Sequence, residues 1–370
     1  MHIPFVSLYS EEKAALVDEI LADFKKVIES SQFILGPSVE EFEKEFAKIA
    51  GTAFGVGVNS GLDALILSLR ALGIGPGHEV ITAPNSFLAT AAAIELVGAK
   101  TVFVDVNEDF NIAPEKIEAA ITKKTKAIMP VHLTGNPARM TEINAIAQKH
   151  GLFVIEDAAQ AIGAMENGKP VGSLGTVSAF SLHPLKNLHV WGDGGMIVTN
   201  SPELATNLKL QRNHGLRNRD EADFFSYNSR LDTLQSVVGR HFLKLLEQTT
   251  EKRIHNANLY STRLSHLKGK LELPTVRPGV RHVFHVFQTR ATHRDALKQF
   301  LSDHGVDSKI HYPMPIHWQK AAQNLGYKKG DFPVTDKLAG EILSLPIREN
   351  LREDEILYVC DLVDTFYKKN

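Results

Sequence analysis

Short apolar runs alternate with amphipathic stretches from about residue 50 to residue 200. An apolar run bounded by turn residues predicts a buried strand, and apolar positions three and four residues apart predict a helix. The predicted strands are 54–58, 79–82, 100–105, 127–131, 151–157, 177–180 and 196–199. The predicted helices are 11–30, 38–50, 61–72, 114–121 and 141–150. This alternation favours an α/β fold with a mainly parallel, doubly wound sheet and right-handed crossovers.

Local signals mark two of the helix starts. Ser38 followed by Glu41 is a capping-box pattern, which predicts Ser38 as the N-cap of its helix. The helix at 61–72 follows a strand and a turn at Gly61, so its first backbone N–H groups could hold an anion such as a phosphate. The alternative is a tight turn in which Gly61 takes a left-handed conformation.

The pattern changes after residue 200. A helix from 203 leads into Arg212, Arg217 and Arg219, which predict a solvated surface; the less favoured alternative is a site for a phosphate-bearing substrate. A long helix is expected from 227 to 264. Beyond it, strands are expected at 282–290 and 308–313 and helices at 294–304 and 354–367. We therefore predict a large domain over 1–245 and a smaller C-terminal α/β domain over 246–370.

Composition narrows the class of protein. The chain of 370 residues is 43% hydrophobic and 23% charged with a net charge of −2, which favours a globular protein and argues against nucleic acid as a partner. Cys360 is the only cysteine, which excludes an intrachain disulfide and fits a reducing compartment. A signal peptide, a membrane-spanning apolar run and a histidine–cysteine cluster with metal spacing are all missing from the sequence. We expect a cytoplasmic protein without a membrane partner or a metal.

Two strand ends carry candidate chemistry. Lys186 follows the strand 177–180 in a segment with few other charges. Loss of hydration lowers the pKa of a lysine toward the range in which its free amine attacks carbonyls. Taken alone, a lysine that reaches solvent from a loop is the simpler interpretation. Asp157 ends the strand 151–157, at the edge of an α/β sheet where ligands bind. It could keep a heterocyclic nitrogen protonated, as pyridoxal 5′-phosphate (PLP) requires, or cap a helix.

Three separated motifs change that balance. They are Glu156-Asp157-Ala-Ala-Gln160, Phe180-Ser181-Leu-His183-Pro-Leu-Lys186 and Gly192-Asp-Gly-Gly195. Together they resemble the signature of the DegT/StrS-type sugar aminotransferases, PLP enzymes of fold type I, and the resemblance extends from about Phe33 to the C-terminal segment. It implies a large PLP-binding domain and a smaller C-terminal domain.

The resemblance also implies roles for individual residues. Lys186 would carry PLP and move protons, while Asp157 would hold the ring nitrogen protonated, with Glu156 as the next candidate. The expected cofactor-binding set is Gly61, Leu62, Phe87, Asp157, Gln160, Ser181, Lys186 and Asn228. Leu62 stands where many relatives have a hydroxyl, so only its backbone N–H could contact the phosphate. Phe87 would stack on the pyridine ring, although a core aromatic is the simpler interpretation.

Partners follow from the same resemblance. Asn228 lies in an Asn-x-Arg-Leu-Asp motif that relatives contribute from the partner subunit, which implies a homodimer with shared active sites. The substrates would be glutamate and a keto sugar, in amino-sugar, cell-surface polysaccharide or lipopolysaccharide biosynthesis. His132, His311 and His317 are candidates on the substrate side, although a lone histidine such as His132 is more often structural.

Two other activities stay open. A PLP sugar dehydratase shares this fold, but that branch typically has histidine in place of Lys186. A regulatory relative that binds PLP or sugar without turnover is the second alternative, and the full set Asp157, Gln160, Ser181 and Lys186 argues against it.

Overall fold

A seven-stranded sheet forms the centre of the computed structural model, which describes residues 1–8 and 14–369. The strand order is β1-β9-β8-β5-β4-β2-β3. These strands are β1 Phe54–Val58, β2 Glu79–Thr82, β3 Lys100–Phe103, β4 Thr125–Ile128, β5 Phe153–Asp157, β8 Val177–Ser181 and β9 Gly195–Thr199. Strand β9 is antiparallel to β8 and β1, and the pairs from β8 to β3 are parallel. The expected mainly parallel sheet is confirmed.

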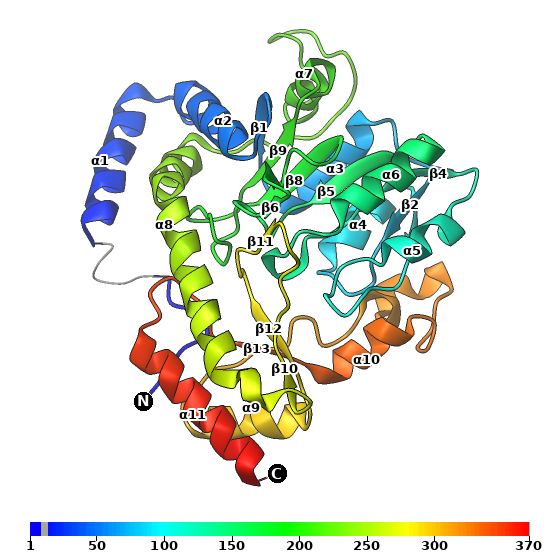
Figure 1. Ribbon diagram of the computed structural model, residues 1–370. Coiled ribbons are helices and arrows are strands. Elements are labelled where there is room, and N and C mark those ends of the chain that lie inside the picture. Colours follow the sequence, from blue (N-terminus) through cyan, green and yellow to red (C-terminus); the bar gives the residue numbers. More distant parts are fainter. Residues whose placement is uncertain (9–13, 370) are drawn as a thin grey trace.

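Helices cover both faces of this sheet (Figure 1). On one face, α3 (Gly61–Ala71) and α4 (Ala89–Leu96) share a core with Ile155 of β5 and Ile197 of β9. On the other face, α2 (Pro37–Ile49) packs near Phe180, and α6 (Met140–His150) packs near Val154 of β5. Neighbouring residues of β5 therefore serve opposite cores, as the pleat of a strand requires. The doubly wound arrangement predicted from the sequence is confirmed.

The C-terminal lobe has a core of its own. Its sheet has the order β10-β12-β13, formed by β10 Leu271–Glu272, β12 Phe287–Ala291 and β13 Ile342–Leu345. Its helices are α9 Arg294–Asp303, α10 Pro333–Glu341 and α11 Glu353–Lys369. The N-terminal segment joins this core, because Ile3 is fully buried there and pairs with Val306.

One long helix joins the two parts. Helix α8 (Thr233–Leu264) packs on α1 (Ala14–Ser30) and α2 at one end and on α11 at the other (Figure 1). It passes without a break through residue 245, so the division at 245/246 stays a prediction. A small sheet lies between, with β6 Met165–Glu166, β7 Lys169–Pro170 and β11 Val280–Arg281. The remaining helices are α5 Pro114–Ile117 and α7 Pro202–Gln211, with short 3₁₀ turns at Glu118–Ala120, Leu133–Gly135, Ser265–Leu267, Ile316–Trp318 and Lys320–Leu325.

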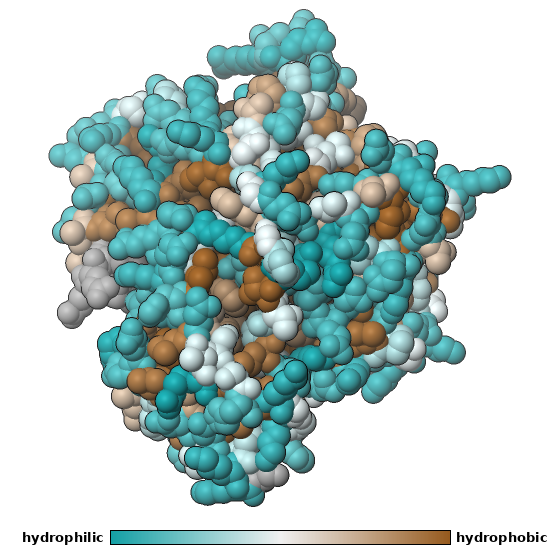
Figure 2. Space-filling model, viewed as in Figure 1, coloured by the Kyte–Doolittle hydropathy of each residue, from teal (hydrophilic) through white to brown (hydrophobic). Residues whose placement is uncertain are grey.

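The surface in the same view is mostly hydrophilic (Figure 2). Apolar side chains show through where the part that carries the large sheet meets the C-terminal lobe (Figure 2). Within residues 1–8 and 14–369, no helix is both long and apolar enough to cross a membrane.

Several local predictions are wrong. Helix α2 starts at Pro37 with Gly36 as N-cap, because proline presets the first helical turn; Ser38 lies inside the helix and accepts a hydrogen bond from the Ser236 hydroxyl. The long helix begins at Thr233 rather than at 227. Of the helix predicted over 11–30, residues 11–13 lie outside the described residues, and α1 covers the rest.

The predicted C-terminal strands are also shorter than expected. Of the strand predicted over 282–290, only the end is extended, as β12, and the short strand β11 precedes it. The backbone N–H groups of Val283 and Val286 donate to the loop at Gly135 and Thr134 instead of to a strand. The segment 308–313 makes a single bridge, between Lys309 and Ser344.

Candidate active site

A cavity of about 510 Å³ opens at the carboxyl ends of β5 and β8. Its wall combines the large sheet, the segment after β8 and the C-terminal lobe. The predicted site residues that line it are Gly61, Leu62, Phe87, Asp157, Gln160, Ser181, Lys186 and His311. The structure thus brings together residues from five separate segments of the chain, and it places them where parallel α/β sheets bind ligands.

Lys186 lies in a turn that follows β8, where its backbone N–H donates to the His183 carbonyl at 2.9 Å. Its amine is surrounded by the cavity wall, and loss of hydration lowers its pKa to about 8, an effect that the negative charge of Asp157 only partly offsets. A substantial fraction of the amine is therefore neutral near pH 8, and such an amine is both a nucleophile and a base.

Asp157 is the last residue of β5 and is buried. Burial raises the pKa of its carboxyl group, although a hydrogen bond from the Thr90 hydroxyl to Oδ2 at 2.7 Å opposes this shift. The Ala159 N–H donates to Oδ1 at 3.3 Å. A cationic partner in the cavity would stabilise this carboxylate strongly, since the site has a low dielectric.

The first turn of α3 faces Ser181 at the end of β8. A Cβ atom at Gly61 would lie 2.8 Å from the Cβ of Ser181, so only glycine allows this approach. Ser60 caps the helix by accepting the Asp63 N–H at 3.0 Å, which leaves earlier N–H groups of the turn for a ligand. Helix N-termini of this kind bind phosphate.

The opposite wall is aromatic and amide in character. Gln160 accepts the Thr134 N–H at 2.6 Å and donates from Nε2 to the Tyr312 hydroxyl at 3.1 Å. The ring of Tyr312 lies 5.7 Å from that of Phe87, which is 59% exposed. Phe87 therefore belongs to the cavity wall and not to the core, which contradicts the simpler interpretation of this residue.

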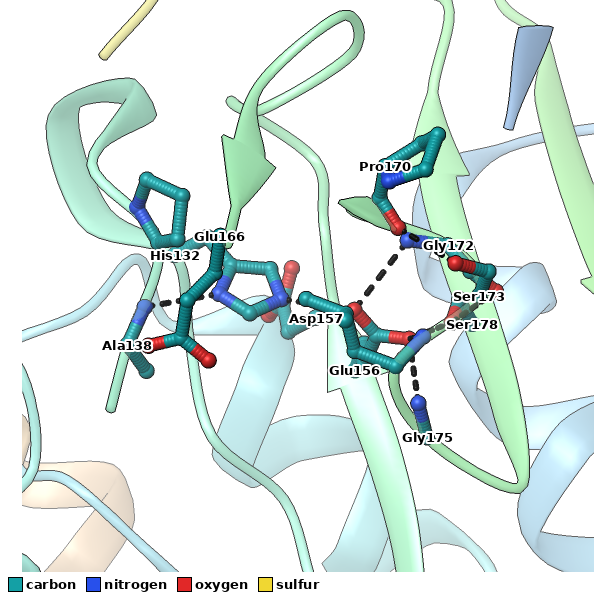
Figure 3. A network of polar contacts seen from close by, with 12 residues as sticks. His132, Ala138, Glu156, Asp157, Glu166, Pro170, Gly172, Ser173, Gly175 and Ser178 are labelled. Atoms are coloured by element: carbon teal, nitrogen blue, oxygen red, sulfur yellow. Dashed lines mark hydrogen bonds and ion pairs between the residues drawn. The ribbon is translucent and has the colours of Figure 1, made fainter. Parts of the chain in front are cut away.

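Two of the predicted histidines do not line the cavity. His132 is fully buried: its Nδ1 accepts the Ala138 N–H at 3.0 Å, so Nε2 carries the proton and bonds Glu156 Oε2 at 3.0 Å (Figure 3). His317 is bonded to Asp336 at 3.0 Å. These two histidines have structural partners instead of the substrate-facing position predicted for them.

The carboxylate of Glu156 lies on the opposite side of β5 from that of Asp157 and is surrounded by hydrogen-bond donors. Its Oε1 accepts N–H groups of Leu174 and Gly175 and the Ser178 hydroxyl, while Oε2 accepts the N–H of Gly172 and the His132 bond (Figure 3). Burial would raise its pKa, but these hydrogen bonds outweigh that effect and hold the pKa below its usual value. Glu156 therefore does not serve as an alternative to Asp157 in the cavity.

Other predicted residues lie outside this cavity. Asn228 is exposed and pairs with Asn213. Arg212 is buried against Glu43, and Arg217 pairs with Asp223. Neither these two arginines nor Arg219 lines the cavity, so the phosphate-binding interpretation of the basic stretch stays a less favoured prediction.

The structure adds cavity residues that the sequence did not reveal. They are Thr90, Asn187, His285 and Tyr312, together with Arg253 and Arg348 from the side of the C-terminal lobe. Tyr312 and Asn187 stand next to predicted residues, which was the one available signal. Burial raises the pKa of Tyr312 to about 12 and lowers that of His311 to about 4, so both side chains stay neutral around pH 7.

The donor set fits PLP. A helix N-terminus with a serine hydroxyl suits its phosphate, a buried under-bonded carboxylate suits its ring nitrogen, an amine of lowered pKa suits its carbonyl, and an aromatic wall suits its ring. Within the described residues, no group of three metal-binding side chains was found.

Comparisons with known proteins agree with this chemistry. The sequence profile of the DegT/DnrJ/EryC1/StrS aminotransferase family matches residues 14–364. The chain is 46% identical over 363 residues to a UDP-N-acetyl-3-dehydro-alpha-D-glucosamine 3-aminotransferase of Acidithiobacillus ferrooxidans, with 98% of this chain and 97% of the relative covered. It is 44% identical over 370 residues to a pleiotropic regulatory protein of Geobacillus stearothermophilus, which covers 100% and 99%. The crystal structure of DesV from S. venezuelae in complex with a ketimine intermediate has a TM-score of 0.96 at 40% identity and covers 99% and 98%.

Proposed function

The chain belongs to the DegT/DnrJ/EryC1/StrS aminotransferase family, whose cofactor is PLP, and we propose that it transfers the amino group of glutamate to a nucleotide-linked keto sugar. The observation that carries this proposal is the meeting of Lys186, Asp157 and the Gly61–Ser181 contact in one cavity. The products would be 2-oxoglutarate and an amino sugar.

Three residues of the cavity would take part in the reaction in this proposal. Bound PLP supplies an electron sink for the carbanion formed at the amino-bearing carbon. Lys186 would carry the cofactor and, once freed, move a proton with its neutral amine, which its lowered pKa makes available. Asp157 would hold the ring nitrogen protonated, while Gln160 would contact the ring hydroxyl.

The remaining contacts would bind rather than react. Ser181 and the first N–H groups of α3, at Gly61 and Leu62, would hold the phosphate. Phe87 would cover one side of the ring, and His311 faces the space left for substrate. These roles rest on the geometry of the cavity and on the family resemblance together.

The choice of a nucleotide-linked sugar is supported by a relative. The enzyme of A. ferrooxidans is named for a UDP-linked 3-dehydro sugar, and its likeness covers almost the whole of both chains. We extend the substrate class, though not the particular sugar, to this chain. The product would serve the biosynthesis of surface polysaccharide such as lipopolysaccharide, and this use, like the cytoplasmic location, stays a prediction.

The likeness to a regulatory protein of G. stearothermophilus favours a second function, in which cofactor or sugar is sensed without turnover. Two features favour turnover over sensing. Burial lowers the pKa of Lys186, and the buried carboxylate of Asp157 accepts only two hydrogen bonds from described residues. Both arrangements reduce stability, and perturbed groups of this kind are typical of catalytic sites, so we place turnover first. Dehydration is disfavoured because Lys186 can carry the cofactor covalently, which a histidine cannot.

Lys186→Ala tests the proposed function. Wild-type enzyme should release 2-oxoglutarate from glutamate, one molecule per site, and then form an amino sugar from a keto sugar in a panel of nucleotide-linked substrates. The variant should lose both half-reactions by about 10⁴-fold or more, since it lacks the proton shuttle and the nucleophile. Borohydride should trap the cofactor on the peptide that contains Lys186 only in wild type.

Lys309→Ala is the matched control, because Lys309 lines the same cavity but is exposed. This control should keep the trapped cofactor and the glutamate half-reaction. Release of a deoxy sugar by wild type, or nitrogen exchange at the wild-type rate in Lys186→Ala, would refute the proposal.

We also propose that two chains share each site. Asn228 is exposed, is absent from the lining of its own cavity, and stands beside Tyr227 and the 97% exposed Phe225. Mixing Lys186→Ala chains with Asn228→Asp chains should restore part of the activity, because one hybrid site would be intact. Verified mixed dimers without any recovery would show that each chain completes its own site.

A further inference from the structure

The cavity wall contains a histidine, His285, that the proposed function leaves unused. His285 lines the cavity from the segment before β12, and its neighbours Val283 and Val286 donate backbone N–H groups to Gly135 at 3.1 Å and to Thr134 at 3.3 Å. A Cβ atom at Gly135 would lie 2.7 Å from Val283 Cγ2 and 3.1 Å from the backbone nitrogen of His285. Glycine at this position therefore lets the segment enter the cavity wall.

The orientation of the Asn187 amide decides which ring nitrogen of His285 carries the proton. Asn187 Nδ2 donates to the Val283 carbonyl at 3.1 Å, and a carbonyl can only accept. The other end of the amide, Oδ1, therefore faces His285 Nδ1 at 3.2 Å, and it too can only accept. Nδ1 must then carry the hydrogen, which leaves Nε2 with a free lone pair.

The charges around His285 keep this ring neutral. Burial holds the pKa of His285 well below its usual range, and the positive charges of Lys186 and Arg253 lower it further. A positive charge on His311 would lower the pKa of His285 in the same direction. A neutral ring with a fixed Nδ1–H is a hydrogen-bond acceptor at Nε2.

We propose that His285 is a further catalytic residue whose Nε2 accepts a hydrogen bond from the reacting amine, that of Lys186 or of the incoming amino substrate, and that Asn187 is the positioning residue that fixes this tautomer. The inference rests on the proposed function for the identity of the amine. Lys186 and Asn187 are consecutive residues, so one turn supplies both the reactive amine and the group that orients its acceptor. The acceptor would keep one N–H of the amine engaged and direct its lone pair toward the reacting carbon.

The tautomer can be measured without turnover. Holoenzyme of the full chain, labelled with ¹⁵N at histidine, should show by solid-state ¹⁵N NMR one protonated Nδ1 and one unprotonated Nε2 that disappear in His285→Gln. In Asn187→Ala these signals should change, because the ring is released to the other tautomer. Asn187→Asp retains an acceptor at Nδ1 and should keep the signals of the Nδ1–H form.

Kinetics of the glutamate half-reaction supply the second readout. His285→Leu should lower the rate of 2-oxoglutarate release at saturating glutamate by about tenfold to a hundredfold with little change in KM, since the hydrogen bond matters most at the reacting amine. His285→Gln, whose amide oxygen is an acceptor at a similar reach, should recover part of this loss. Asn144→Ala removes a similar bond from an asparagine amide to a backbone carbonyl, that of Leu174; neither residue lines the cavity, so the rate should not change.

A protonated Nε2 in wild type, a tautomer that ignores Asn187→Ala, or a wild-type rate in His285→Leu would each overturn the inference. Failure of the proposed function looks different, because wild type would then release no 2-oxoglutarate from glutamate. A rescue by His285→Gln that matches the preserved tautomer in Asn187→Asp would support the assignment of both residues.

Discussion

Glu156 and Asp157 are consecutive buried carboxylates at the end of one strand, and the two sides of β5 treat them in opposite ways. Glu156 accepts five hydrogen bonds, and its pKa is held below the usual value in spite of burial. Asp157 accepts two hydrogen bonds from described residues, and burial raises its pKa. The first side is complete without a ligand, and the second is not.

The difference separates a structural carboxylate from a functional one. Glu156 ties the loop at Gly172–Gly175 and His132 to the sheet, so its interaction energy is already used in folding (Figure 3). Asp157 has an unused capacity to interact with a cation and faces the cavity with Lys186. Burial alone does not identify the catalytic acid; incomplete hydrogen bonding in a cavity does.

Asp157→Asn should have the largest effect on this comparison. An amide cannot stabilise a protonated ring nitrogen as a carboxylate does, so turnover should fall by about 10²–10³-fold while PLP remains bound. Steady-state kinetics and cofactor absorbance measure the two properties. Asp193→Asn, in which another acid of the cavity lining is changed, should stay near the wild-type rate. Normal turnover in Asp157→Asn would mean that the acid is wrongly assigned.

Glu156→Gln should act on stability instead. The new NH₂ group would face the N–H groups that now donate to the carboxylate, so the free energy of unfolding should fall by about 3 kcal/mol. Urea denaturation measures this loss, and Asp157→Asn serves as the comparison that keeps its stability. Equal stability losses in the two variants would remove the distinction drawn between the two sides of β5.

Thr90→Val should give a smaller loss of activity. It removes the hydroxyl that donates to Asp157 Oδ2, and turnover should fall by about tenfold because one charge-assisted hydrogen bond is lost. Thr82→Val removes a similar buried hydroxyl that donates to the Met129 carbonyl outside the cavity. Turnover of the Thr82 variant should not change, and a similar loss in both variants would point to a general packing effect.

The pH dependence of stability should separate the two carboxylates by sign. Asp157 has a raised pKa in the folded state, so its contribution is most favourable below its usual value of 3.8 and is lost as pH rises through the folded pKa. Glu156 has a lowered pKa, so its contribution is present above 4.5 and is lost as pH falls through the folded pKa. Urea denaturation of apoenzyme on lowering the pH from 7 should therefore raise the stability of wild type relative to Asp157→Asn and lower it relative to Glu156→Gln. A shift of the same sign in both comparisons would contradict the assignment.

Much of the fold and of the cofactor site follows from the sequence. The apolar runs predicted the strands of the large sheet, and parallel strands place their carboxyl ends at one edge, so Asp157 and Lys186 could be expected near each other. Family resemblance added Gly61, Phe87, Gln160 and Ser181, all of which line the cavity. The predicted strands, and the predicted residues that share one cavity, depend on local periodicity and on motifs within short segments, which is why the sequence could reveal them; the roles of these residues stay predictions.

The residues that the sequence missed depend on contacts between distant segments. His285 lies in an alternating pattern that predicted a strand. The absence of a side chain at Gly135 instead lets this segment pack into the cavity wall, where His285 Nδ1 bonds Asn187 Oδ1. His132 was predicted to face substrate from its place after a strand, and His317 from the resemblance of its segment to the family's substrate-side loop. Both have carboxylate partners instead.

The sequence by itself determined that residues 156 and 157 face opposite sides of a strand, because side chains alternate along an extended chain. It also determined that Lys186 follows the next strand of the parallel set. Only the tertiary structure decided which side of β5 is closed by the loop at Gly172–Gly175 and which side opens on the cavity. The physical reason is that alternation specifies a period without a direction, and the direction is set by the helices and loops that pack on each face.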